Sequence, residues 1–404
     1  MSKIYEIDPD ADTLVVVRPL ADSFAPWPAH DHNGASQASA APAVPTADVR
    51  IKVSSKHLSL ASPRFRDILA QKAAAAAAAA SSAAASPVSS PARNGYKTPP
   101  ASPGKSSLSG NSNSLWRKEA AAPPSPPLSN SGGSSYSQTE EADGRIHIVL
   151  EGLDADAVTT VLNIVHGRGG KDRVPKTVSL EALARIAAVV DKFKLHDAVE
   201  IYADRWVDAV GHPSAEKSSR RELTLWIYVA YVFQRDTLFR EATKLAATQL
   251  TGPLPALANL PLRAKIAHDI DAQRQEVVGQ ALDVLEGAVG TLVASGSEGS
   301  EGSEEDDDAN PADTLLLGAL LRTLHRHKAI WPRPAAPYAG VSIAAIAGAV
   351  HEVQTQTWKT AYRLGESTRF NKTNNALKLT PQLDSLKASV AGLTLKSELG
   401  YNLY

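Results

Sequence analysis

Two histidine pairs are the first residues whose spacing could do chemistry. His30 and His32 form a His-x-His pair, and two imidazoles at that spacing can share a metal ion. They lie in a polar loop without a third ligand beyond scattered Asp, whereas a structural zinc ion requires four fixed ligands. His325 and His327 flank Arg326 late in an expected helix, where basic side chains complement the helix dipole. We therefore expect no metal site.

Acid–base catalysis needs a reactive group, a partner and an orienting shell. The sequence spells out no such constellation, and helix faces carry scattered charges routinely. We therefore expect no enzyme activity and no cofactor, with an enzyme in the helical half as the remote alternative. The acid–base candidates for that alternative are Glu222, Asp236, Glu241, His268 and Asp269. Gly167-Arg168-Gly169-Gly170 resembles a phosphate loop only in its glycines, because it follows a helix rather than a strand.

Composition indicates an intracellular protein, in the cytoplasm or the nucleus. The formal net charge is -1, so there is no bulk electrostatic case for binding nucleic acid or an anionic membrane. The chain has no cysteine, which excludes disulfides, thiolate zinc ligands and a cysteine nucleophile. We expect no signal peptide after Met1 and no stretch approaching the ~18 to 20 apolar residues that span a bilayer.

Hydrophobic periodicity predicts an α+β fold. Residues 12–19, 49–53 and 145–150 read as short strands, since Val49, Ile51 and Val53 alternate with two cations. Ser62 can cap a helix whose first position is Pro63. Later helices are expected after the caps Asp154 and Ser179, over 195–210, and almost continuously from about 220 to 354.

Two stretches lack the apolar residues needed for a core, and we expect both to be disordered: 70–143 and the acidic loop at 295–311. The alanines at 73–80 can extend the preceding helix, since alanine has the highest helix propensity. Ser102 and Thr98, each followed by proline, are candidate phosphorylation sites. Phosphorylation would add about -1.5 to -2 charge. The alternative is that such dipeptides are simply common in Ser/Pro-rich tracts.

The order strand, strand, capped helix, strand, helix, helix, helix resembles the BTB/POZ domain. The most specific segment is Lys56-His57-x-x-Leu60-x-Ser62-Pro63-x-Phe65. The resemblance implies that His57 and Leu60 pack under the sheet. It also implies that Ser62, Pro63 and Phe65 begin the next helix.

Further segments resemble a fungal group of BTB proteins with a helical C-terminal region. They include 162–168, 174–176, 225–226, 233–234 and 274–276. Two departures from the family stand out. Only about a dozen residues precede Leu14, where members that form intertwined dimers carry an extra helix and strand. The insertion also follows the first capped helix, close to where family members contact cullin scaffolds.

The resemblance implies a BTB/POZ domain over 1–210 with the insertion inside it, a helical region over 214–360, and a tail, 361–404, without assignment. The expected function is non-catalytic protein–protein interaction, through self-association or partner recruitment. One version is an adaptor for a cullin ubiquitin ligase, and the alternative is an oligomeric scaffold or transcription-associated regulator. The expected partners are proteins, with no direct nucleic acid, no membrane and no small-molecule substrate.

Overall fold

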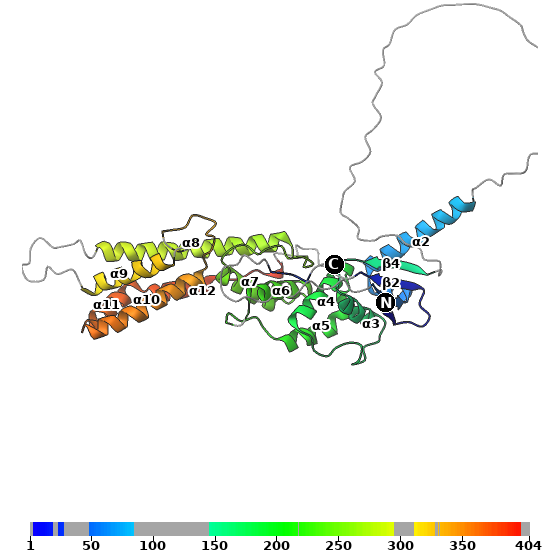
Figure 1. Ribbon diagram of the computed structural model, residues 1–404, viewed down its shortest axis with the longest axis horizontal. Coiled ribbons are helices and arrows are strands. Elements are labelled where there is room, and N and C mark those ends of the chain that lie inside the picture. The colour runs from blue at the N-terminus through cyan, green and yellow to red at the C-terminus, as the bar shows by residue number, and fades with distance from the viewer. Residues whose placement is uncertain are drawn as a thin grey trace, which may run out of the picture. The chain divides into compact units, whose positions relative to one another are not determined.

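The computed structural model describes residues 3–18, 23–27, 48–84, 145–216, 218–294, 311–327, 330 and 332–396 (Figure 1). Contacts divide the chain into two compact units. One unit comprises Met1–Leu69 and Tyr136–Tyr404, and the other is Ala70–Ser135. All of the architecture below belongs to the first unit, apart from residues 70–84 of one helix.

A mixed sheet confirms the α+β class. Its strands are β1 (Lys3–Glu6), β2 (Thr13–Val17), β3 (Val49–Val53) and β4 (Ile146–Leu150), in the order β1-β3-β2-β4. β2 pairs antiparallel with β3 and parallel with β4, which places Val15 opposite both Ile51 and Ile148. All three side chains are fully buried. The three expected strands are therefore confirmed, whereas β1, which pairs parallel with β3, was not expected.

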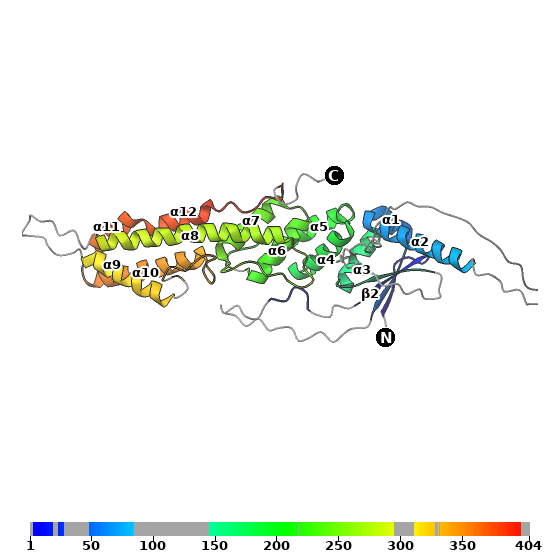
Figure 2. The ribbon, with the colours of Figure 1, turned by 90° about the horizontal axis from the view of Figure 1, so that it is seen from above.

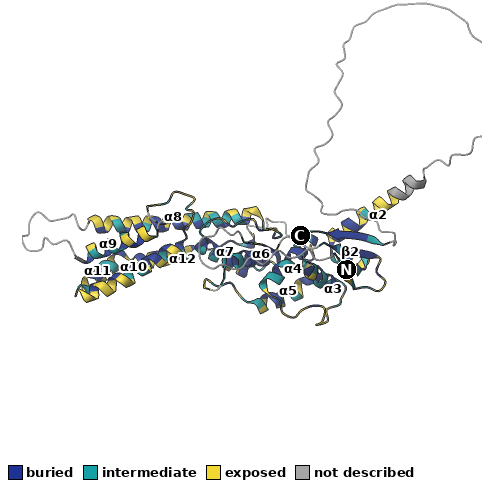
Figure 3. Ribbon diagram, viewed as in Figure 1, coloured by how far each residue is buried: buried dark blue, intermediate teal, exposed yellow. Residues whose placement is uncertain are grey.

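Three of the five helices that the structure describes around the sheet begin where the sequence places their caps, at Ser62, Asp154 and Ser179. The five helices are α1 (Ser55–Ala61), α2 (Pro63–Ala84), α3 (Ala155–Val165), α4 (Leu180–Phe193) and α5 (His196–Val210). Asp154 accepts the Ala157 amide at 2.9 Å, and Ser179 accepts the Ala182 amide at 3.2 Å. α2 continues through the alanine run, as expected, and its residues 70–78 are mostly exposed (Figure 3). α1 was not expected.

The next two helices are α6 (Arg220–Val232) and α7 (Asp236–Gln249). The α6 sequence is apolar on all sides, and every residue from Leu223 to Val232 is buried. A helix of this kind is stable only inside a core. α6 packs against both α4 and α7, and one hydrophobic cluster includes residues of the sheet and of the last helices. The expected boundary near 210–214 therefore lies within a continuous core.

The C-terminal helices are α8 (Ala264–Ala294), α9 (Pro311–Arg326), α10 (Ile343–Arg363), α11 (Ser367–Leu377) and α12 (Leu379–Ser389) (Figures 1 and 2). α11 and α12 lie in the tail, 361–404, for which the sequence predicted no structure. The segment after α12 returns to α7, where the Leu393 amide donates to Thr243 at 2.9 Å and the Leu395 amide donates to Asp236 at 2.9 Å. The described part of this tail therefore belongs to the folded unit.

α8 is long and apolar enough to cross a membrane by length and composition, although no such stretch was expected. Its buried residues pack in the structure against α7, α9, α10 and α12, while exposed residues follow its outer side (Figure 3). Its carboxylates Asp283 and Glu286 bind Arg333 at 2.7 and 2.6 Å. In this structure α8 is a core helix.

Arg274 on α8 is the largest charged side chain in the described core. Its side chain is 1% exposed, and its Nε donates to Asp271 at 2.7 Å. Its terminal nitrogens donate to the carbonyls of Pro337 at 2.7 Å and Tyr338 at 3.2 Å. A buried guanidinium that is paired, with every nitrogen hydrogen-bonded, anchors the segment before α10 to α8.

Replacing Arg274 with Met should destabilise the protein strongly, because the substitution leaves Asp271 and the loop carbonyls without their buried donor. We expect a loss of about 3–5 kcal/mol in the free energy of unfolding, measured by urea denaturation. Lys265→Gln on the same helix removes an exposed pair with Asp269 and should cost at most about 0.5 kcal/mol. Equal losses in the two variants would contradict the anchoring role.

Candidate functional site

Ser62 forms the junction between α1, α2 and α4. Its hydroxyl is buried, accepts the Phe65 amide at 3.0 Å and donates to the carbonyl of Phe193 at the end of α4. The rings of Phe65 and Phe193 stack with centroids 4.2 Å apart. Pro63 occupies the first position of α2, where its missing N–H costs nothing. The expected roles of Ser62, Pro63 and Phe65 at this helix start are therefore confirmed.

The expectation that His57 and Leu60 pack under the sheet is wrong. His57 is exposed and Leu60 is 83% exposed, while Leu58 between them is fully buried. The physical reason is that this segment is the helix α1, in which successive side chains are about 100° apart. With Leu58 facing the core, Leu60 points to the opposite side and His57 lies at the flank.

His57 instead lies beside His166, the residue that ends α3. The two rings have centroids 4.8 Å apart and are tilted by 32°. The Ser54 amide donates to Nε2 of His166 at 3.1 Å, so Nε2 is an acceptor and the proton is on Nδ1, which donates to the Leu162 carbonyl at 2.8 Å. Burial, opposed by the Leu162 bond and reinforced by the nearby His57, lowers the pKa of His166. His166 is therefore neutral at neutral pH.

Asp8, in the connection between β1 and β2, completes this group. One potential ligand atom from each of Asp8, His57 and His166 lies within 4.8 Å of the other two. The group gives no signal in the sequence because its members come from three elements far apart in the chain. His57 and His166 were noticed only as parts of separate motifs. No local spacing could have revealed the cluster, because the fold alone brings the three residues together.

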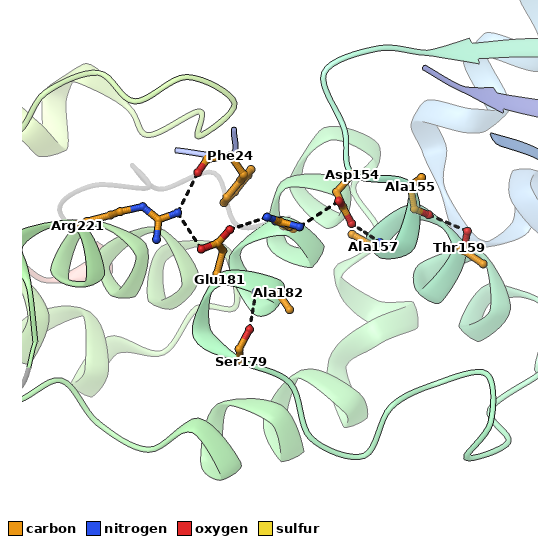
Figure 4. A network of polar contacts seen from close by, with 10 residues as sticks. Phe24, Asp154, Ala155, Ala157, Thr159, Ser179, Glu181, Ala182 and Arg221 are labelled. Atoms are coloured by element: carbon orange, nitrogen blue, oxygen red, sulfur yellow. Dashed lines mark hydrogen bonds and ion pairs between the residues drawn. The ribbon is translucent and has the colours of Figure 1, made fainter. Parts of the chain in front are cut away.

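A chain of ion pairs links the starts of three helices. Arg221 of α6 donates to Glu181 at 2.9 Å and to the Phe24 carbonyl at 2.9 Å (Figure 4). Arg185 of α4 donates to the second oxygen of Glu181 at 2.5 Å and to Asp154 at 3.2 Å. Burial favours a higher pKa for Glu181, but the two guanidinium groups outweigh burial and hold the pKa below 4.5. This network positions helices rather than a reacting group.

The candidate acid–base groups do not gather into a site. The four carboxylates each bind a nearby donor, and His268 is exposed on α8. They are Glu222, Asp236, Glu241 and Asp269. An open pocket of about 530 Å³ lies between α8 and the segment joining α11 to α12, and none of these groups lines it.

Several expected features lie outside the described residues. These are the His30–His32 pair, the candidate phosphorylation sites Ser102 and Thr98, and the acidic loop. His327 is described, and its Nε2 is 3.8 Å from Glu352, which also binds Arg326 at 2.6 Å. That arrangement is an ion pair between α9 and α10.

The chain was also compared with known proteins. It matches no family model, and no curated protein or solved structure is significantly similar to it.

Replacing Ser62 with Ala should cost about 1–3 kcal/mol of unfolding free energy. The substitution removes the cap of α2 and leaves the buried Phe193 carbonyl without its donor. Ser179→Ala removes one cap bond at an exposed position and should cost about 1 kcal/mol. Denaturant titrations of both variants check this order, and a smaller loss for Ser62→Ala would contradict the junction.

Glu181→Gln should destabilise the protein most at neutral pH. Because the pKa of Glu181 is lowered in the folded state, its charge stabilises the fold above its unfolded pKa, and that stability is lost as the pH falls through the folded pKa. The difference in unfolding free energy between wild type and Glu181→Gln should therefore shrink as the pH falls from about 6 to about 3. Glu200→Gln, on the exposed face of α5, is the control and should show a small difference throughout. A pH-independent difference for Glu181→Gln would contradict this account.

Proposed function

We propose that the chain is a non-catalytic protein-interaction module whose α+β part is a BTB/POZ-like domain. The observation that supports this most is the order of elements from β2 to α5, which agrees with the strand, strand, capped helix, strand and three-helix order of that domain, with α1 added before the capped helix α2. The Ser62–Pro63–Phe65 helix start is a second point of agreement. The C-terminal helices extend the same core rather than adding a separate substrate-reading unit.

Exposed apolar side chains on three elements of the α+β part are candidate contact points for a partner. Leu60 on α1 and Ile201 on α5 are each 83% exposed, and Ile4 on β1 is 58% exposed. Burial of such side chains drives most protein association, at about 1.5–3 kcal/mol for each large side chain. β1 is also an edge strand of the sheet, and edge strands can pair with a further strand.

A second copy of the chain is the partner that we test first. A heterologous protein partner, including a cullin-type scaffold, is the second version of the proposal. If the chain self-associates, it would act as an oligomeric scaffold or a transcription-associated regulator. The second unit begins at Ala70, within α2.

Light scattering after size exclusion should show a dimer of the full chain that is lost in Leu60→Asp. The reason is that the substitution places a charge in an apolar contact. Leu364→Asp is the matched control, because Leu364 is 65% exposed at the end of α10, in the helical region. A version lacking residues 73–142 shows whether the insertion affects assembly.

Two results bear on the partner. A wild-type monomer at all concentrations would refute self-association and favour a one-to-one adaptor, to be tested by co-purification of a cullin from native extract. A dimer that Leu60→Asp leaves intact and Leu364→Asp disrupts would move the interface to the helical region. A monomer that co-purifies with no protein would refute the proposal.

A further inference from the structure

The residues Asp8, His57 and His166 combine ligands that the proposed interaction function does not use. Two imidazoles and one carboxylate are the donor set of zinc sites that have three protein ligands and an open fourth position. All three come from the same folded unit but from different elements: the β1–β2 connection, α1 and the end of α3. We propose that these three residues bind a divalent transition-metal ion, with zinc as the best fit.

The three potential ligand atoms are close enough to bind one metal ion after small movements of their side chains. The three potential ligand atoms lie within 4.8 Å of one another. Three atoms separated by that upper limit would each be about 2.8 Å from a common centre, against about 2.0–2.2 Å for zinc bonds to nitrogen and oxygen. Each side chain therefore has to move by about 0.8 Å at most. His57 is exposed and Asp8 is partly exposed, so both have room to do so.

His166 is already oriented as a metal ligand would be. Its Nδ1–H donates to the Leu162 carbonyl, and ligating histidines usually hold their second ring nitrogen in such a bond. Nε2 carries a lone pair that the Ser54 amide now occupies at 3.1 Å. The ion would replace this amide as the partner of Nε2. Ser54 is partly exposed, so water can then satisfy its amide.

The protonation state favours binding as well. A metal ion binds the neutral imidazole, so it competes with protons on each histidine. Nε2 of His166 accepts the Ser54 amide, so this nitrogen carries no proton that a metal ion would have to displace. A cation bound between the two rings would use both lone pairs.

The donor set discriminates among ions. Imidazole nitrogens suit zinc, copper, nickel and cobalt, whereas calcium and magnesium require mostly oxygen ligands. Only Asp8 supplies oxygen here. We therefore expect zinc or cobalt to bind and a large excess of magnesium or calcium to leave that binding unchanged.

Bound metal would tie the N-terminal strand to the rest of the unit. β1 pairs with β3 over only four residues, and an exposed pair between Glu6 and Lys52 adds little. A metal ion held by Asp8, His57 and His166 would connect the end of this strand to α1 and α3. This site does not depend on the proposed interaction function, and its test below needs no partner.

The experiment is calorimetric titration of zinc chloride into the full chain after chelator treatment. We expect one zinc ion per chain, and cobalt in its place should give visible absorption bands of a low-symmetry, nitrogen-ligated ion. Asp8→Asn and His57→Gln should each weaken zinc binding by about 100-fold or more, since loss even of a residue that only supports a ligand costs about 10–100-fold. Asn at position 8 can still accept the Asp10 amide, so the local turn is kept.

Two control variants separate this site from other histidines. The double variant His30→Gln, His32→Gln removes the pair that is adjacent in sequence, and His212→Gln removes an exposed histidine on another surface. Both should bind zinc as the wild type does. Unfolding curves without metal should coincide for Asp8→Asn, His57→Gln and wild type. Thermal unfolding with zinc should then separate them, because only the wild type gains stability from bound metal.

The proposal is overturned if the wild type takes up no zinc. It is also overturned if Asp8→Asn and His57→Gln bind zinc undiminished, or if the His30, His32 double variant alone loses binding. If the chain dimerises through Leu60, Asp8→Asn and His57→Gln should still form the dimer in light scattering even though they have lost zinc binding. Failure of this site can therefore be distinguished from failure of the interaction module.

Discussion

The burial of α6 from Leu223 to Val232 is the constraint on which the rest of the structure depends. A helix that is apolar on every side has no face for water, so it must be covered by elements from both directions. α4 covers it from the α+β part and α7 from the C-terminal part. Its first turn carries Arg221, which holds the loop at Phe24 and reaches Glu181 on α4. The sheet and the helical region therefore share one core.

Features that the sequence could predict are those that depend on neighbouring residues. Alternation identified three strands, and the caps Asp154 and Ser179 located the starts of α3 and α4, because each signal lies within a few residues of the feature it defines. β1 could not be predicted in this way. Its sequence, Lys-Ile-Tyr-Glu, has little apolar pattern, and it is a strand because β3 offers it a pairing edge. α11 and α12 depend similarly on packing against α8, α9 and α10.

The residues of the candidate site also fall into those that neighbouring residues predict and those that only the tertiary fold brings together. Ser62 and Phe65 were predictable because the cap and the buried ring lie three residues apart on one helix. The burial of His57 and Leu60 was predicted wrongly, since a match in residue types does not fix which side of a short helix faces the core. Leu58 takes that place. The group of Asp8, His57 and His166 depends on the tertiary fold, so sequence spacing held no signal for it.

α1 carries both the exposed Leu60 of the proposed interaction surface and the His57 of the proposed metal site. Its first residue is held by Asp12, which accepts the Ser55 amide at 2.7 Å, and its last turn ends at the buried Ser62 junction. A seven-residue helix fixed at both ends cannot rotate freely, so the direction of Leu60 is set by these anchors. His57 lies on the same short helix. A metal ion bound at His57 would thus add a third anchor to the element that presents the exposed leucine, and it would act on the rigidity of that surface rather than on its composition.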